Sequence, residues 1–399
     1  MASRIFLISQ TESILTNRGK RHPDLAKYLV ENNYELRYIS SNYYHAEKRF
    51  FSPTEITKAV SKIDYKLEII NITAYQSNIS IARVFSNLIF ACKTQKFLRG
   101  KINKEDVTIV PSRPVELLLF VSLLKRKTGF KVILDIRDIW PDAFNIKNRF
   151  LKSLFSSYCN YFLNRSINHF DNFIHTCPSF TQWLSRYAPS KRSVFIPLGY
   201  NQERYQTFQK VRNRERIIHF VYIGLIQYQI DLLPFIKAIE NNGAFHLTII
   251  GDDGTGEKFK SVEDYIIVNS VGNVKMLGQI SQELVPEELL NYDVGLLPMK
   301  ADYVFPNKLF DYLASGLPIL SLGDNDASRF VTENGIGWKC QFDTEQIKEL
   351  LDQISNAPED EIQKASERIS LISGQYSREV LFNDLLKIVN HASTNAEII

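Results

Sequence analysis

Short apolar runs alternate with stretches of helical periodicity through the first half of the chain. The periodic stretches predict helices that include residues 23–30 and 115–124, and the apolar runs predict strands at 4–9, 34–40, 107–110, 131–135 and 169–176. Strands that alternate with helices need crossover connections, which make the strands parallel and cover both faces of the sheet. The first half is therefore expected to be an α/β domain.

The same alternation starts again near residue 217. Helices are expected at 232–240, at 282–291 and from Pro306 onward, and strands at 218–224, 245–251, 274–278 and 294–298. The fold class is therefore α/β, with two tandem Rossmann-like domains facing a central cleft, because ligands of open α/β sheets bind beyond the carboxyl ends of the strands. We expect an N-terminal domain at 1–197, a hinge at 198–216, a C-terminal domain at 217–376, and a final helix and tail at 377–399 that pack back on the N-terminal domain.

Residues 306–320 read P-N-K-L-F-D-Y-L-A-S-G-L-P-I-L, which predicts a helix followed by a buried strand. Proline suits the start of this helix, and Gly316 suits its left-handed end. Lys308 and Asp311 share a face near the helix N-terminus, where free N–H groups and the helix dipole favour an anion. A cation for a phosphate beside a carboxylate for a sugar hydroxyl is what a nucleotide-sugar site requires. A surface ion pair between the two residues is the alternative.

Composition limits the partners and the compartment. The 399 residues are 44% hydrophobic and 23% charged, and the net charge of +4 is too small to indicate nucleic acid as a partner. The cysteines lie far apart without metal-type pairing, so we expect buried free thiols in a reducing compartment. Neither a secretory signal nor an apolar run long enough to span a membrane is visible. We expect a cytoplasmic protein, soluble or peripheral at the inner face of the cell membrane.

Several motifs of the second half resemble those of family 4 glycosyltransferases and occur in the same order. They are V-Y-I-G at 221–224, I-I-G-D at 249–252, N-V-K-M-L-G at 273–278, Y-D-V-G-L-L-P at 292–298, and the segment 306–318. The first half, through D-I-R-D-I-W-P at 135–141, resembles the branch that makes bacterial cell-surface polysaccharides. The resemblance implies the GT-B fold and transfer with retention from a nucleotide sugar, most often a UDP-sugar.

By this resemblance, Lys308 takes the place of the family's phosphate-binding lysine. Asp311 takes the place of a glutamate that holds the ribose hydroxyls, and a shorter aspartate can still accept those hydrogen bonds. The other positions expected around the donor are Gly224 beside the diphosphate, Gln279 and Ile280 at the nucleobase, and Asn307 and Leu309 next to Lys308.

The sequence departs from the family pattern at three places. Tyr303 stands where the first of two glutamates is expected. Gln227 and Gln229 are the nearest polar residues in the loop that usually supplies a cation to the diphosphate. The first loop, at 10–22, lacks paired glycines but holds Arg18 and Lys20, which we expect on the acceptor side, where they would also help to neutralise the diphosphate.

Retention implies that the diphosphate departs while an acceptor hydroxyl attacks the same face of the sugar. Lys308 and helix N–H groups would stabilise the developing charge, so we expect neither a metal nor a cofactor. Asp135 and Asp138 follow an apolar strand, which places them at the edge of the cleft. Asp135 is expected to bind the acceptor, and Asp138 to orient its hydroxyl or support the donor sugar. A structural salt-bridge cluster of Asp135, Arg137 and Asp138 is the alternative.

Basic and apolar residues interleave at 84–98, which predicts a basic amphipathic helix on an anionic membrane, or a solvated helix packed on the sheet. His22 and His45 are expected at the surface. The expected partners are a nucleotide-sugar donor, a saccharide or lipid-linked acceptor, an anionic membrane surface, and a homo- or hetero-oligomer. The main hypothesis is a retaining hexosyltransferase. A catalytically weak or inactive partner subunit of an active glycosyltransferase is the alternative, which Tyr303, Gln227 and Gln229 favour.

Overall fold

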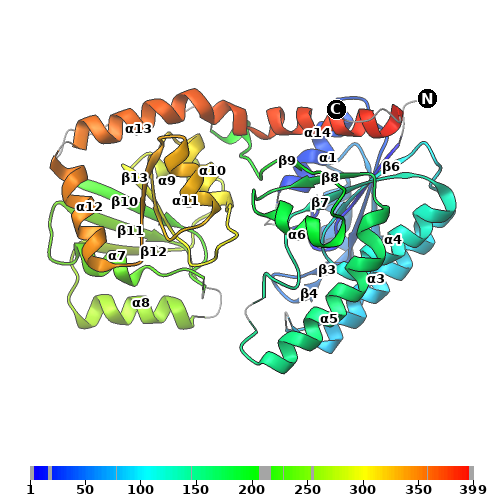
Figure 1. The fold of residues 1–399 in the computed structure, drawn as a ribbon, viewed down its shortest axis with the longest axis horizontal. Coiled ribbons are helices and arrows are strands. Elements are labelled where there is room, and N and C mark those ends of the chain that lie inside the picture. Colours follow the sequence, from blue (N-terminus) through cyan, green and yellow to red (C-terminus); the bar gives the residue numbers. More distant parts are fainter. Residues whose placement is uncertain are drawn as a thin grey trace. The chain divides into compact units, whose positions relative to one another are not determined.

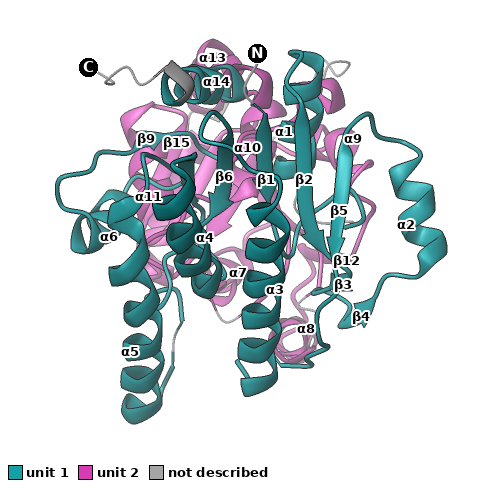
Figure 2. Ribbon diagram, turned by 90° about the vertical axis from the view of Figure 1, so that its right-hand side faces the viewer, with its two compact units in different colours: residues 1–197, 381–399 teal, residues 198–380 magenta. Residues whose placement is uncertain are grey.

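The computed structural model of the protein describes residues 4–16, 20–77, 79–144, 146–205, 217–227, 229–252, 256–356 and 358–394. It divides the chain into two compact units, which Figure 2 colours separately: unit 1 holds residues 1–197 and 381–399, and unit 2 holds residues 198–380. None of the described helices combines the length and the apolar character needed to cross a bilayer.

Unit 1 is built on a parallel sheet of seven strands in the order β5-β2-β1-β6-β7-β8-β9. These strands are β1 (Ile5–Ile8), β2 (Leu36–Ser41), β5 (Lys66–Ile70), β6 (Val107–Pro111), β7 (Lys131–Ile136), β8 (Asn172–His175) and β9 (Val194–Phe195). A short antiparallel hairpin of β3 (Tyr43–Tyr44) and β4 (Arg49–Phe50) follows β2. All four residues of β1 are completely buried, as its neighbours on both sides and its apolar sequence require.

Helices cover both faces of this sheet (Figure 1). They are α1 (Arg21–Glu31), α2 (Pro53–Val60), α3 (Ile81–Arg99), α4 (Val115–Thr128), α5 (Arg149–Ser166), α6 (Phe180–Tyr187) and the C-terminal α14 (Arg378–Thr394). Side chains of α1 and α14 share one core with strands β1 and β6, including Leu25, Leu29, Leu381, Phe382 and Leu385. The prediction that the final helix packs back on the N-terminal domain is therefore confirmed.

Helix α3 contains the predicted 84–98 segment. It packs against α4 and buries Asn87, Phe90 and Leu98 on its inner side. One side of the segment is therefore packed within the unit, whereas its other side, with Phe85, is exposed. The four cysteines are free thiols; three are buried as expected, whereas Cys92 of α3 is exposed.

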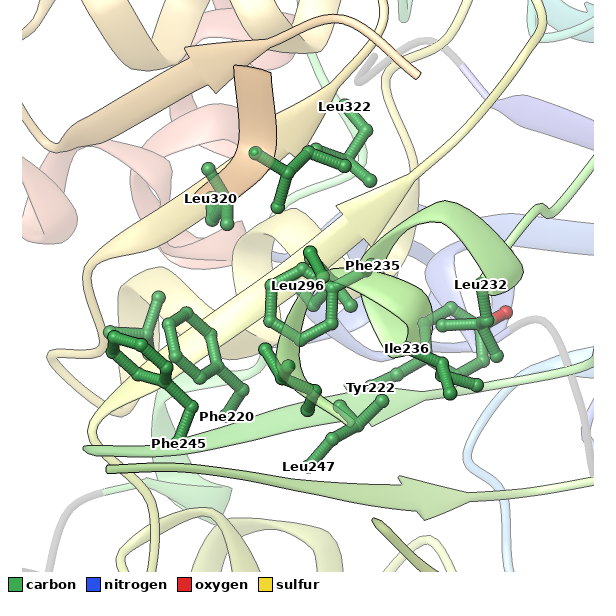
Figure 3. Packing of buried hydrophobic residues seen from close by; sticks show 14 of the residues in the cluster. Phe220, Tyr222, Leu232, Phe235, Ile236, Phe245, Leu247, Leu296, Leu320 and Leu322 are labelled. Carbon is green, nitrogen blue, oxygen red and sulfur yellow. The ribbon is translucent and has the colours of Figure 1, made fainter. Parts of the chain in front are cut away.

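Unit 2 contains a second parallel sheet, of six strands in the order β12-β11-β10-β13-β14-β15. The strands are β10 (Ile218–Ile223), β11 (Phe245–Ile250), β12 (Val274–Gly278), β13 (Val294–Pro298), β14 (Ile319–Leu322) and β15 (Gly337–Cys340). The helices are α7 (Leu233–Ile239), α8 (Glu257–Val268), α9 (Val285–Leu289), α10 (Asn307–Ala314), α11 (Asp326–Glu333), α12 (Thr344–Asn356) and α13 (Pro358–Ile372). Figure 3 shows Phe220 of β10 and Phe235 of α7 in the core between sheet and helices, with ring centroids 4.9 Å apart.

The boundaries of the units lie a few residues from the expected ones. The first residues of α14 remain with unit 2, because Arg378 donates its N–H to the Tyr200 carbonyl at 2.8 Å. The chain therefore returns from unit 2 to unit 1 at residue 381 instead of residue 377. Of the expected hinge at 198–216, residues 198–205 belong to unit 2, and residues 206–216 lie outside the described part of the chain.

Candidate functional site

Lys308 lies in the first turn of α10, which begins where the extended backbone of Pro306 turns into the helix. Its Nζ donates a hydrogen bond to the Tyr222 hydroxyl at 2.8 Å and lies 4.0 Å from the centre of the Tyr222 ring. Burial, offset only in part by Asp311, lowers the pKa of Lys308 from 10.5 to about 7. A half-buried amine whose hydrogen-bond partner is a phenol gains a favourable interaction when an anion arrives.

Gly224 provides the space for this amine at the end of β10. Its φ is +129°, and a Cβ at this position would come within 3.0 Å of Lys308 Nζ. Gly251, at the end of the neighbouring β11, is as constrained, because a Cβ there would lie 2.2 Å from the Gly224 carbonyl oxygen. The two glycines therefore bring two strand ends and the lysine closer together than any side chain would permit.

Tyr312 fixes the position of α10 on the sheet. Its hydroxyl accepts the N–H of Ile223 at 3.2 Å and lies 3.1 Å from the carbonyl oxygen of Val221, to which it donates. A Cβ at Gly295 of β13 would lie 2.5 Å from the Tyr312 ring, so the helix approaches that strand closely. Sequence reasoning missed Tyr312, although its place one residue after Asp311, on the inner side of the predicted helix, was a usable signal.

Asp311 already has a partner within unit 2. The Tyr205 hydroxyl donates to Asp311 Oδ1 at 2.7 Å, and the Tyr205 ring lies against Tyr200 with centroids 5.6 Å apart. Burial raises the pKa of Asp311, and the hydrogen bond from Tyr205 opposes that rise. Tyr205 was not predicted from the sequence, because nothing local connects residues 106 positions apart.

The other expected donor residues differ in accessibility. Four of them are exposed: Gln227, Gln279, Tyr303 and Asn307. Ile280 is half-buried just after β12, whereas Leu309 is completely buried and donates its N–H to the Pro306 carbonyl. The structure therefore joins Lys308, Gly224 and Asp311 around the start of α10, and the side chain of Leu309 lies in the core.

A buried cluster of charged groups lies at the carboxyl end of the unit 1 sheet. Asp135 is completely buried, accepts a hydrogen bond from the Arg21 guanidinium, and lies 3.1 Å from His22 Nε2. Glu12 accepts the His22 N–H at 2.8 Å and Arg137 Nη1 at 2.5 Å. Burial raises the pKa of Asp135, but Arg21 and His22 outweigh it, so the net pKa is lowered. Asp135 has no exposed surface with which to touch an acceptor.

Two expectations for the first loop change accordingly. His22 is completely buried instead of lying at the surface, and burial together with Arg137 lowers its pKa. Lys20 is half-buried and donates to the Thr16 carbonyl at 2.5 Å, whereas Arg18 lies outside the described residues. The signal for the cluster was present in the sequence as an acid at Glu12 and consecutive bases at 21 and 22, but its partners come from β7.

Asp138 differs from Asp135 because it is partly exposed. Its backbone is fixed by Ser112, whose Oγ donates to the Asp138 carbonyl at 2.6 Å, and its Oδ2 lies 3.5 Å from Arg113 Nε. The structure therefore separates the two aspartates, with Asp135 inside the buried cluster and Asp138 open at the strand end. Among the described residues, no group of three or more His, Cys, Asp or Glu side chains is arranged to hold a metal ion.

Comparisons with known proteins concern the sequence family and the fold. Residues 215–360 match the family model of the glycosyl transferases group 1. The chain is 24% identical over 294 residues to a probable glycosyltransferase, WbjE, of Pseudomonas aeruginosa. The aligned residues cover 69% of this chain and 71% of that protein.

Solved structures show the same fold at low identity. Sucrose-phosphate synthase of Thermosynechococcus elongatus aligns with a TM-score of 0.74 and 13% identity over 99% of this chain and 100% of that one. HepE of Anabaena, in complex with UDP, aligns with a TM-score of 0.70 and 11% identity over 97% and 99%. WaaG, a glycosyltransferase of lipopolysaccharide biosynthesis, aligns with a TM-score of 0.67 and 14% identity over 96% and 99%.

Proposed function

We propose that the chain is a glycosyltransferase that transfers a sugar with retention from a nucleotide-sugar donor to a saccharide or lipid-linked acceptor. The match of residues 215–360 to the group 1 glycosyl transferases and the likeness to a probable glycosyltransferase support this proposal. A UDP-sugar is the proposed donor, since solved proteins of this fold hold UDP or UDP-glucose. The product would serve cell-surface glycan synthesis; WaaG, which has the same fold, is involved in lipopolysaccharide biosynthesis.

The observation that carries the proposal is the environment of Lys308. A diphosphate placed at the start of α10 would accept hydrogen bonds from its amine and from first-turn N–H groups that have no helical partner. Gly224 keeps the space beside the amine free of a side chain. As the bond between the sugar carbon and the diphosphate oxygen breaks, negative charge grows on that oxygen, and a preorganised cation stabilises it without a metal.

On the acceptor side, Asp138 is the proposed carboxylate. It has exposed surface and a fixed backbone, whereas Asp135 has no contact with solvent. In the proposed step the acceptor oxygen bonds to the sugar carbon, the diphosphate leaves from the same face, and the acceptor proton passes to a departing phosphate oxygen. Asp138 orients the attacking hydroxyl before transfer by accepting its hydrogen bond, and that bond breaks as the proton moves to the phosphate oxygen.

Donor turnover by the purified protein tests this proposal. A panel of nucleotide sugars is incubated with the protein, and release of the free nucleotide is measured with and without saccharide acceptors. We expect turnover with one donor and a loss of at least a hundredfold in Lys308→Ala, with little change in Lys348→Ala, an exposed lysine of α12. Equal activity in both variants would contradict the role of Lys308.

The hydrogen bond between Tyr205 and Asp311 favours one alternative, a catalytically inactive partner subunit. The carboxylate expected to hold the ribose already accepts a hydrogen bond from inside the protein. If no donor is turned over, and the protein instead raises the activity or stability of a co-purified glycosyltransferase, the partner function replaces the enzymatic one.

A further inference from the structure

The first turns of α5 protrude from unit 1 with large apolar side chains in the solvent. All eight residues from 147 to 154 are exposed, although the helix starts at Arg149. Phe150 is 75% exposed, Leu151 53% and Leu154 60%. These three side chains follow one another at positions that share one face of the helix. Several large apolar residues gathered in this way indicate an interaction surface, unlike single exposed ones.

The first turns of α3 add to this surface at the same end of the unit (Figure 2). Ile81 is 76% exposed and Phe85 60%. Helices α3 and α5 meet at Glu116, at the start of α4, which accepts hydrogen bonds from Asn87 of α3 at 3.2 Å and from Tyr158 of α5 at 2.7 Å. Each helix begins well before this common point, so both starts reach past α4. We define the apolar rim as Ile81, Phe85, Phe150, Leu151 and Leu154.

The two segments that carry the apolar rim hold charges of one sign. Residues 143–170 contain no aspartate or glutamate, and neither do residues 69–104. Lys147, Arg149 and Lys152 are exposed at the start of α5, and the two within the helix lie on the side away from its apolar stripe. Apolar side chains beside cations, on segments that contain no acid, complement a bilayer, whose interior is apolar and whose headgroups are anionic.

We propose that the apolar rim docks unit 1 on an anionic lipid bilayer, with its five side chains among the upper acyl chains and the three cations at the headgroups. Two helix ends that project separately can insert into a bilayer, because lipids adapt to their shape, whereas a protein partner would need a complementary surface. The cations meet lipid phosphates there, each strengthening attachment about fivefold. This inference concerns attachment alone and does not depend on the proposed transfer reaction.

Co-sedimentation of the full chain with vesicles tests the proposal. One vesicle preparation contains phosphatidylcholine alone, and the other contains equal parts of phosphatidylcholine and phosphatidylglycerol. We expect the protein to sediment with the phosphatidylglycerol vesicles, and high salt to weaken that binding. Replacing Phe150, Leu151 and Leu154 together by serine should lower the partition coefficient at least tenfold. The double variant Arg149→Ser/Lys152→Ser should lower it on the anionic vesicles only.

The matched control removes exposed apolar side chains elsewhere. Ile267 and Val268 at the end of α8 are 68% and 80% exposed, and replacing both by serine should leave vesicle binding unchanged. Absence of binding to anionic vesicles by the wild-type chain would overturn the proposal, and so would equal binding by the triple variant. If instead the wild-type chain is a dimer or binds a second protein, and the triple variant alone loses that contact, the apolar rim is a protein interface and the membrane proposal is wrong.

Discussion

The hydroxyl of Tyr205 donates to Asp311 Oδ1 at 2.7 Å, so a residue just before the 206–216 segment holds the carboxylate proposed to bind ribose. A ribose hydroxyl would make the same kind of hydrogen bond to the same atom. Binding of the donor and the bond from Tyr205 are therefore expected to compete, and the competition lowers the apparent affinity for the nucleotide.

Tyr205→Phe separates the two interactions. The free protein should lose about 1–2 kcal/mol of unfolding free energy, because a half-buried carboxylate loses its donor, while UDP should bind several-fold more tightly. Denaturant unfolding and calorimetric titration measure the two effects. Tyr265→Phe is the matched control, since Tyr265 also donates to a carboxylate, Glu240, at 2.7 Å. Unchanged UDP affinity in Tyr205→Phe would show that Asp311 does not face the nucleotide.

The pKa of Lys308 predicts how donor affinity depends on pH. The pKa is about 7 in the free protein, and a bound diphosphate raises it, so binding takes up a proton above pH 7. The affinity for a nucleotide sugar should therefore be highest below pH 7 and fall about tenfold between pH 7 and pH 8.5. Titrations at several pH values should show this slope in the wild type and lose it in Lys308→Ala. The same slope in that variant would assign the proton to another group.

Gly224→Ala tests the space beside the amine. The new Cβ would meet Lys308 Nζ at 3.0 Å, and an alanine at φ +129° is strained, so stability should fall by about 1–3 kcal/mol. The affinity of the folded protein for the nucleotide should also fall about tenfold, because the Lys308 amine is displaced. Gly272→Ala, which has nothing within 4 Å of its Cβ position, should do neither. Thermal unfolding with and without UDP distinguishes the two variants.

The buried charged cluster should support the stability of unit 1. Asp135→Asn leaves the Arg21 guanidinium buried without its counter-charge and should cost about 3–5 kcal/mol of unfolding free energy. Asp142→Asn breaks the exposed pair with Arg186 and should cost at most about 1 kcal/mol. Comparable losses in the two variants would mean that the cluster is hydrated in solution.

Acid should destabilise the protein through its histidines before its carboxylates are protonated. Burial lowers the pKa of His45 from 6.5 to about 3, and burial also lowers the pKa of His22. The unfolded chain binds these protons below about pH 6.5 and the folded chain does not, so stability falls as pH drops through that range. In His45→Gln the fall between pH 6.5 and pH 4 should be shallower by about 1.4 kcal/mol per pH unit.

The apolar pattern predicted both parallel sheets because their central strands are continuous runs, such as β1 and β13. It missed β5, an edge strand whose alternating Lys66 and Glu68 leave it half-exposed. It also missed α5, whose exposed apolar start hides the helical period. The buried side of α3 carries the polar residues Ser86, Asn87 and Thr94. The polar positions in its sequence therefore did not mark its exposed side.

For the candidate site, local spacing was enough to select Lys308 and Asp311, since one helix carries both. The partners Tyr222 and Tyr205 could not be found in the same way, because the fold brings them from 86 and 106 residues away. Asp135 and Asp138 look equivalent in sequence. They differ in the structure because the first is inside β7 and the second lies two residues beyond its end, where the chain meets water.

The return of α14 onto unit 1 affects how this protein can be made. Leu381, Phe382 and Leu385 close a hydrophobic core whose other residues include Ile5 and Leu25 from the opposite end of the chain. A nascent chain that has emerged only to residue 197 would therefore expose part of this hydrophobic core until residues 381–392 leave the ribosome. A truncated fragment of residues 1–197 should precipitate when expressed alone, and a synthetic peptide of residues 378–394 should rescue its solubility.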